Sequence, residues 1–230
     1  IDNNSCLYEI DCLGDCGGEA IEDNCGICNG NSESCIISDH EGNLYETVII
    51  GSQLWMSENL KTTHYNNGDP IPTGLSNDTW YNTTTGAYAV YEDNPAYGDV
   101  YGNLYNWYTV DDDRGVCPLD WHVPSDEEYT ILTDFLGGTS IAGGKMKEAG
   151  LSHWNSPNTG ATNESGFTGL PAGFRNYDGS YNIMGNYGYF WSSAEFSSYD
   201  AWFRRLGYDN SDVFRYYTTP GVCSEQVVLY

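Results

Sequence analysis

Cysteine clustering at the N-terminus constrains this chain more than any other feature of its sequence. The chain has 230 residues and eight cysteines. Six of them lie in the first 35 residues: Cys6, Cys12, Cys16, Cys25, Cys28 and Cys35. A segment of this size cannot bury enough apolar area to fold alone, so its cysteines must supply the constraint. We therefore divide the chain into a cysteine-rich acidic spacer module at residues 1–38 and one globular domain at residues 39–230.

Two chemistries could hold the N-terminal module together, disulfides or zinc thiolates. Cys12 and Cys16, followed by Cys25 and Cys28, are spaced like paired zinc knuckles. The module has six cysteines rather than four and no histidine before His40, which favours disulfides. Eight cysteines in all indicate an oxidising compartment, and we expect an extracellular chain, secreted or on the cell surface, whose signal peptide has been removed.

The module is also acidic and internally repeated. Residues 11–18 read DCLGDCGG, and residues 22–30 read EDNCGICNG. The pair resembles the short Asp/Cys/Gly repeats that serve as spacers in secreted and surface proteins. Carboxylates held close together repel one another unless a cation bridges them, and Ca²⁺ prefers oxygen ligands. A calcium site at Asp11, Asp15, Glu22 and Asp23 is one interpretation, and solvated surface charge is the other.

The charge of the whole chain excludes some classes of partner. It has 33 acidic and 8 basic residues and a formal net charge of −25. Such a field repels phosphate backbones, so we expect no nucleic-acid partner. No apolar run approaches the roughly 18 residues of a membrane span, so we expect no membrane insertion. An aromatic content of 15% argues against disorder.

Local patterns predict the elements of the globular domain. Residues 45–50 and 53–56 read as two strands joined by a Gly51-Ser52 turn, and residues 62–95 as loop. A helix is predicted at Ser125–Leu136, with Ser125 and Glu128 as a capping box. Its predicted apolar face consists of Tyr129, Leu132, Phe135 and Leu136.

A second helix and a meander are predicted after that helix. The second helix runs from Ile141 to Ala149 and is stopped by Gly150. Short aromatic runs separated by turn residues then predict an antiparallel meander, at residues 188–194, 201–206, 213–217 and 226–230.

Six motifs in the domain stand in a recognisable order. They are Gly51–Leu60 (GSQLWMSENL), Gly102–Trp107 (GNLYNW), Cys117–Glu128 (CPLDWHVPSDEE), Gly143–Lys147 (GGKMK), Gly166–Arg175 (GFTGLPAGFR) and Tyr189–Glu195 (YFWSSAE). Over roughly residues 43–223, the chain resembles the Fibrobacter succinogenes major paralogous domain family. The resemblance implies an α+β, C-type-lectin-like fold with two helices, a twisted antiparallel sheet and a long irregular loop region. It also implies a disulfide between Cys117 and Cys223.

Signatures of catalysis are absent from the sequence. There is no H-E-x-x-H metal motif and no G-x-S-x-G elbow, so we expect no enzyme. Lectin-like domains often bind sugars through loop calcium and exposed aromatic rings, and Trp80 and Trp154 stand in loop context as candidate ligand contacts. Sequons that chance could also explain begin at Asn3, Asn77, Asn82 and Asn163.

These observations favour a secreted, non-catalytic structural or adhesive protein of the cell surface or extracellular matrix, with a self-assembling filament subunit as one form of it. The alternative is a calcium-assisted, glycan-binding lectin-like module. Apolar segments at Thr47–Ile50 and Val227–Tyr230 could add edge to edge to a neighbour, although pairing inside the domain explains them as well. The expected partner is a second copy of the chain, a cell-surface protein or a glycan.

Overall fold

The structure is a computed structural model. It describes residues 11, 13, 15–20, 36–197 and 200–218, and the backbone of residues 223–225. Its helices are α1 (Asn77–Asn82), η2 (Tyr91–Asp93), α2 (Pro95–Tyr101), α3 (Trp107–Val110), α4 (Asp126–Phe135) and α5 (Thr139–Met146). Its strands are β1 (Ile36–Ser38), β2 (Leu44–Ile50), β3 (Gln53–Met56), β4 (Tyr88–Ala89), β5 (Leu104–Asn106), β6 (Phe174–Asn176), β7 (Tyr181–Asn182), β8 (Tyr187–Ser197), β9 (Asp200–Gly207), β10 (Val213–Thr218) and β11 (Cys223–Glu225).

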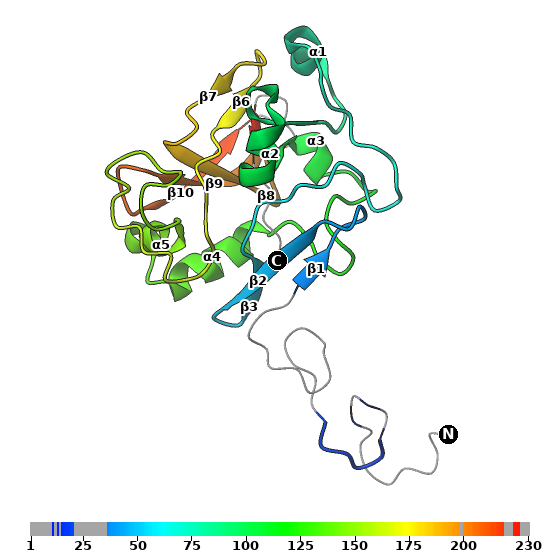
Figure 1. Ribbon diagram of the computed structural model, residues 1–230, viewed down its shortest axis with the longest axis vertical. Coiled ribbons are helices and arrows are strands. Elements are labelled where there is room, and N and C mark those ends of the chain that lie inside the picture. The colour runs from blue at the N-terminus through cyan, green and yellow to red at the C-terminus, as the bar shows by residue number, and fades with distance from the viewer. Residues whose placement is uncertain are drawn as a thin grey trace.

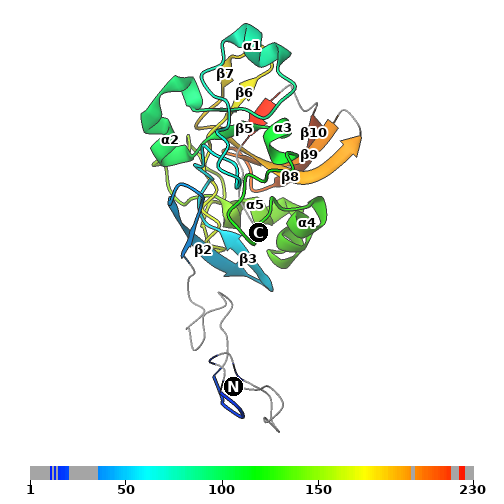
Figure 2. The same cartoon turned by 90° about the vertical axis from the view of Figure 1, so that its right-hand side faces the viewer.

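The strands form three antiparallel sheets, with the orders β1-β2-β3, β10-β9-β8 and β4-β5-β11-β6-β7. The sheet of β8, β9 and β10 lies between helices α4 and α5 on one side and the β6-β7 end of the molecule on the other (Figures 1 and 2). Mixed helices and antiparallel sheets confirm the α+β prediction. The described residues contain five α-helices, however, where two were predicted.

The β2-β3 hairpin forms as predicted. Ile50 pairs with Gln53 across the Gly51-Ser52 turn, and Gly51 has a φ of 68°, a conformation that glycine adopts without strain. Thr47–Ile50 pairs with β3 inside the domain, and both Thr47 and Ile50 are buried. The second predicted edge, Val227–Tyr230, lies outside the described residues.

Helix α4 begins at the predicted capping box. The Ser125 hydroxyl accepts from the backbone N–H of Glu128, and the Glu128 carboxylate accepts from the backbone N–H of Ser125. Tyr129 and Leu132 are buried as predicted, but Phe135 is 63% exposed. Phe135 ends the helix, and its ring lies over Gly51 in the β2-β3 turn instead of entering the core. Its assignment to the buried face was therefore wrong.

Helix α5 ends at Met146, three residues before the predicted Ala149. The next residue, Lys147, has an extended backbone and forms an isolated bridge with Gly169. This bridge takes the chain out of the helix before Gly150 is reached. The predicted end of the helix at Ala149, before Gly150, was therefore three residues too late.

Lys147 is fully buried. Its Nζ donates to the backbone carbonyls of Thr159 (3.0 Å), Gly207 (2.7 Å) and Asn210 (2.7 Å). A buried ammonium needs acceptors for its protons, and here three carbonyls from two segments of backbone supply them. The side chain thus ties an irregular loop to the end of β9 and the turn after it.

Residues 62–95 are mostly irregular, as predicted, but they also contain α1, η2 and β4. The Ser76 hydroxyl accepts from the backbone N–H of Thr79 and caps α1, and the Asn94 side chain caps α2 just beyond. These helices have six and seven residues, too few to show an apolar period in the sequence.

The predicted meander forms in β8, β9 and β10. Its fourth predicted strand, residues 226–230, lies outside the described residues. Trp191 on β8 is fully buried, and its Nε1 donates to the carbonyl of Tyr105 on β5 at 2.9 Å. The rings of Trp191 and Trp107, the first residue of α3, lie 5.4 Å apart. The hydrogen bond thus joins the meander to β5, and the ring contact joins it to α3 through the core.

Candidate binding site

The predicted bond between Cys117 and Cys223 is not formed, because Cys117 is a free thiol. Cys117 packs in the main hydrophobic cluster, and burial raises the pKa of its thiol well above the usual range, although the backbone N–H of Val123 donates to it. In the N-terminal module, Cys16 is disulfide-bonded. The other predicted disulfide residues lie outside the described residues or have no described side chain: Cys6, Cys12, Cys25, Cys28, Cys35 and Cys223.

Asp11 holds its own loop together. Its Oδ1 accepts from the backbone N–H groups of Leu13 (3.0 Å) and Asp15 (2.9 Å), and its Oδ2 accepts from Ala20 (3.1 Å). Among the described residues, no group of three or more His, Cys, Asp or Glu side chains could hold a metal ion. Two of the four proposed calcium ligands, Glu22 and Asp23, lie outside those residues, so the calcium site stays a prediction.

Both tryptophans proposed as ligand contacts are buried, so neither can stack on a ligand in this conformation. Trp80 is 2% exposed on α1, with the guanidinium of Arg175 4.4 Å from its ring centroid. Trp154 is 2% exposed in the main core, and its Nε1 donates to the carbonyl of Gly169. Their loop context suggested exposure, but distant segments fold over both rings.

Three of the four sequons lie among the described residues. Asn77 and Asn82 are exposed on α1. Asn163 is half-buried, and its amide group bonds Thr168 through both Nδ2 and Oδ1. Asn3 lies outside the described residues, and glycosylation itself stays a prediction.

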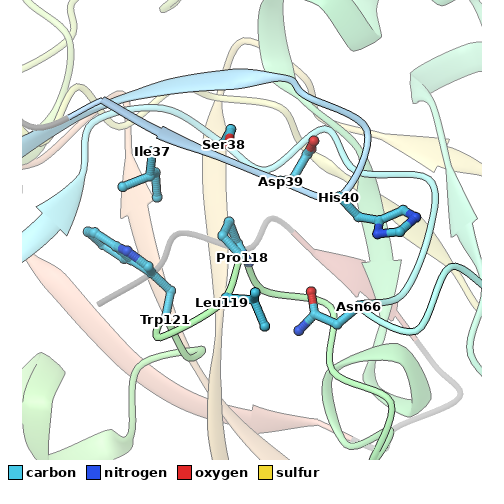
Figure 3. A pocket seen from close by; sticks show the side chains of 8 residues that line it. All are labelled: Ile37, Ser38, Asp39, His40, Asn66, Pro118, Leu119 and Trp121. Atoms are coloured by element: carbon cyan, nitrogen blue, oxygen red, sulfur yellow. The ribbon is translucent and has the colours of Figure 1, made fainter.

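One pocket, of about 410 Å³, opens beside β1. Ile37 and Trp121 line one end of it and His40 and Asn66 the other, as Figure 3 shows. The carboxylate in its wall, Asp39, accepts hydrogen bonds from the backbone and side chain of neighbouring residues and from the buried Tyr45 hydroxyl at 2.6 Å. Because these groups already donate to both Asp39 oxygens, the carboxylate has few acceptor positions left for a ligand.

A second pocket, of about 310 Å³, lies on the meander sheet, and we call it the aromatic groove. Its lining consists of Phe174, Tyr189, Phe203, Arg205, Tyr216, Tyr217 and Thr218. Tyr216 is 42% exposed, so its ring is open to solvent in the groove. Tyr217 is the next residue of β10 and pairs with Trp202, so its side chain lies on the opposite face of the sheet. Pairing places Arg205 opposite Phe214, and Phe203 opposite Tyr216, on one face of β9 and β10.

The rings of the groove hold one another in place. Phe203 lies 5.8 Å from Tyr189 and 5.9 Å from Tyr216, and Phe214 stacks on Tyr216 at 5.8 Å with an interplanar angle of 14°. Tyr217 stacks on Phe196 at 4.0 Å and lies 5.5 Å from Trp202, in a separate aromatic group on the opposite face of the sheet. Mutual packing fixes the rings of the groove on strands, so they form a pre-organised contact surface.

Arg205 stands within this aromatic surface. The carbon of its guanidinium lies 4.6 Å from the Phe214 centroid, 4.9 Å from Tyr187 and 5.0 Å from Tyr216. Its Nε is buried and has no hydrogen-bond partner. The chain has eight basic residues, and each of the other seven contacts a carboxylate or a backbone carbonyl. Arg205 alone has no hydrogen bond or ion pair with any residue that the structure describes.

A family model described as the Fibrobacter succinogenes major domain matches residues 48–226, more than three quarters of the chain. The chain belongs to this family. No curated protein and no solved structure matches it significantly. Within the described part of the chain, no helix is long and apolar enough to cross a membrane.

The sequence predicted strands β2, β3, β8, β9 and β10 of this major domain but not its groove. The signal was present, because Phe203 and Arg205 on β9, and Phe214 and Tyr216 on β10, are each two residues apart and therefore share a face. Only the pairing register, which the sequence does not give, brings these two short patterns together.

Proposed function

We propose that this major domain is a non-catalytic adhesive module that contacts its partner through the aromatic groove. The observation that carries the proposal is the open ring of Tyr216 beside Arg205. Exposed apolar patches on a rigid scaffold mark interaction surfaces, and Tyr and Arg are enriched among residues that dominate binding energy. A cell-surface or matrix glycan suits the groove, because flat rings pack well against sugar rings.

We also propose an extracellular setting, with residues 1–38 as a disulfide-braced spacer. The disulfide of Cys16 supports it, since such bonds persist in oxidising compartments. We further propose that residues 39–230 have a C-type-lectin-like fold. Two helices against an antiparallel sheet, with a long irregular connection, support this proposal.

A glycan array probed with the full chain tests the adhesive function, with and without calcium. We expect binding to a subset of glycans that persists in a chelator, because no carboxylate lines the groove. Tyr216→Ala should lower that binding about 10-fold or more. Tyr177→Ala is the matched control, since Tyr177 is 45% exposed but lies outside the groove.

Three outcomes would overturn the proposal. The first is a wild-type chain that binds no glycan on the array. The second is a Tyr216→Ala variant that binds as well as wild type. The third is binding that disappears in the chelator, which would instead support the calcium-assisted lectin.

A further inference from the structure

The groove contains a positive charge for which the described residues provide no counter-charge. Burial leaves the Arg205 Nε without an acceptor, and such an atom loses its bonds to water without replacement. Ring contacts compensate only part of this loss. In a chain with a net charge of −25, a guanidinium with neither a carboxylate nor a carbonyl acceptor is unusual, because acidic side chains greatly outnumber basic ones.

The terminal nitrogens of Arg205 remain available. They have no hydrogen bond to any described residue and are not among the buried unpartnered atoms, so solvent reaches them. A guanidinium presents its N–H groups as a planar fork that matches a carboxylate. The groove thus offers one anion contact beside ring faces.

The residues around Arg205 indicate what kind of molecule would carry the bound anion. Tyr216 presents ring surface, with the buried Phe203 beneath it, and the hydroxyl of Tyr216 has no hydrogen-bond partner among the described residues. A pyranose has C–H groups on its face and hydroxyls on its edge, so it can pack on rings and bond hydroxyls at once. The strong negative charge of the chain disfavours densely charged polyanions, so an isolated carboxylate fits better.

We propose that the aromatic groove binds a saccharide carrying a single carboxylate, a uronic acid unit, and that Arg205 contacts this carboxylate while Tyr216 packs on the sugar ring. The inference rests on the proposed function, because it names the ligand class of the same groove. It goes beyond that function because it requires a ligand that has both a negative charge and a sugar ring and that binds in the groove.

Titration of the full chain followed by NMR tests the ligand class with four small probes. They are methyl β-glucuronide, its methyl ester, methyl β-glucoside and N-acetylglutamate. We expect the glucuronide to bind about 10-fold or more tightly than each of the others, because only it combines the carboxylate with the sugar ring. If the methyl ester binds as tightly as the glucuronide, the carboxylate is not needed and the proposal is wrong. If N-acetylglutamate binds as tightly as the glucuronide, the sugar ring is not needed and the proposal is wrong as well.

Variants test the assigned residue. Arg205→Gln should weaken glucuronide binding about 10-fold or more, and Arg205→Lys should restore only part of it, since lysine keeps the charge but loses the planar fork. Arg114→Gln is the matched control, because Arg114 also lies over a tyrosine ring but outside the groove. Circular dichroism checks that each variant is folded. Unchanged binding by a folded Arg205→Gln variant would overturn the proposal.

The two proposals fail separately. If no probe binds, but Tyr216→Ala still abolishes binding on the glycan array, the carboxylate inference is wrong and the adhesive function stands. If Tyr216→Ala leaves array binding intact, the adhesive function of the groove is wrong, and the inference that rests on it is wrong as well.

Discussion

Replacing Asp126 with Asn should destabilise the domain strongly, because Asp126 neutralises a buried cation. The Arg204 side chain is only 3% exposed, and its Nη1 donates to Asp126 Oδ1 at 2.8 Å. Arg215 donates to the same carboxylate but is 46% exposed. Burial raises the pKa of Asp126, yet the hydrogen bonds from Arg215 and Arg204 outweigh it and hold the pKa below 3.8. The ionised carboxylate is thus part of the folded state.

The size of the effect follows from the burial of Arg204. Removing one partner of a buried ion pair costs about 3–5 kcal/mol, because the other charge is left buried without compensation. Asn keeps one oxygen acceptor for Arg204, which reduces the loss. Asp126 is also the first residue of α4, where a negative charge contributes roughly 0.3–1 kcal/mol. We expect Asp126→Asn to lower the free energy of unfolding by about 3 kcal/mol.

Equilibrium urea denaturation followed by tryptophan fluorescence measures this loss. Arg215→Ala serves as the control and should cost about 1 kcal/mol or less, because its ion pair is exposed to solvent. The double variant Asp126→Asn with Arg204→Met removes the buried charge together with its partner. It should be more stable than the sum of the two single losses predicts.

Two results would refute this reasoning. One is a loss below about 1 kcal/mol for Asp126→Asn, which would mean that Arg204 needs no counter-charge. The other is an equal loss for Arg215→Ala, which would mean that burial does not set the strength of these pairs.

Two further predictions concern Glu41 and Cys117. Burial raises the pKa of Glu41, but hydrogen bonds from Thr63, His64 and Thr62 outweigh it and lower the pKa to about 2. Because the folded pKa of Glu41 lies below the usual 4.5, its ionised carboxylate stabilises the folded state above that pH. We expect the wild type to be more stable than Glu41→Gln by on the order of 1 kcal/mol, and acid titrations should show this difference disappear as the pH falls from 4.5 to 2. Without reductant, iodoacetamide should alkylate Cys117 in the unfolded chain but not in the native one, and peptide mass spectrometry measures this difference. A disulfide-linked Cys117 peptide would contradict the free thiol.

Much of the fold was predictable because its signals are local. The capping box at Ser125 and Glu128, and the turn at Gly51, each lie within a few residues of the elements they define. The family resemblance was confirmed over most of the domain. The short helices α1 and α3 were missed because six and four residues are too few for an apolar period.

The candidate site was not predictable, because burial and exposure depend on distant segments. Trp80 is covered by Arg175, whose guanidinium also donates to the carbonyl of Leu75, 100 positions away in the chain. Arg205 looks like any other charged residue in the sequence. Only the structure shows that Arg205, unlike the other seven basic residues, has no hydrogen bond or ion pair with a described residue.

The three carbonyls around Lys147 have a consequence for the order of folding. They come from residues 12, 60 and 63 positions further along the chain. Bringing such distant segments together carries a loop-closure cost, and the ammonium cannot leave water at reasonable cost before its acceptors arrive. Lys147 should therefore enter the core late, after the folding barrier is crossed, so that its bonds slow unfolding far more than they speed folding. Lys147 binds the carbonyl of Gly207, the last residue of β9, and β9 carries part of the aromatic groove. Although Lys147 lies outside the groove, it would then determine how long the groove persists before the domain unfolds.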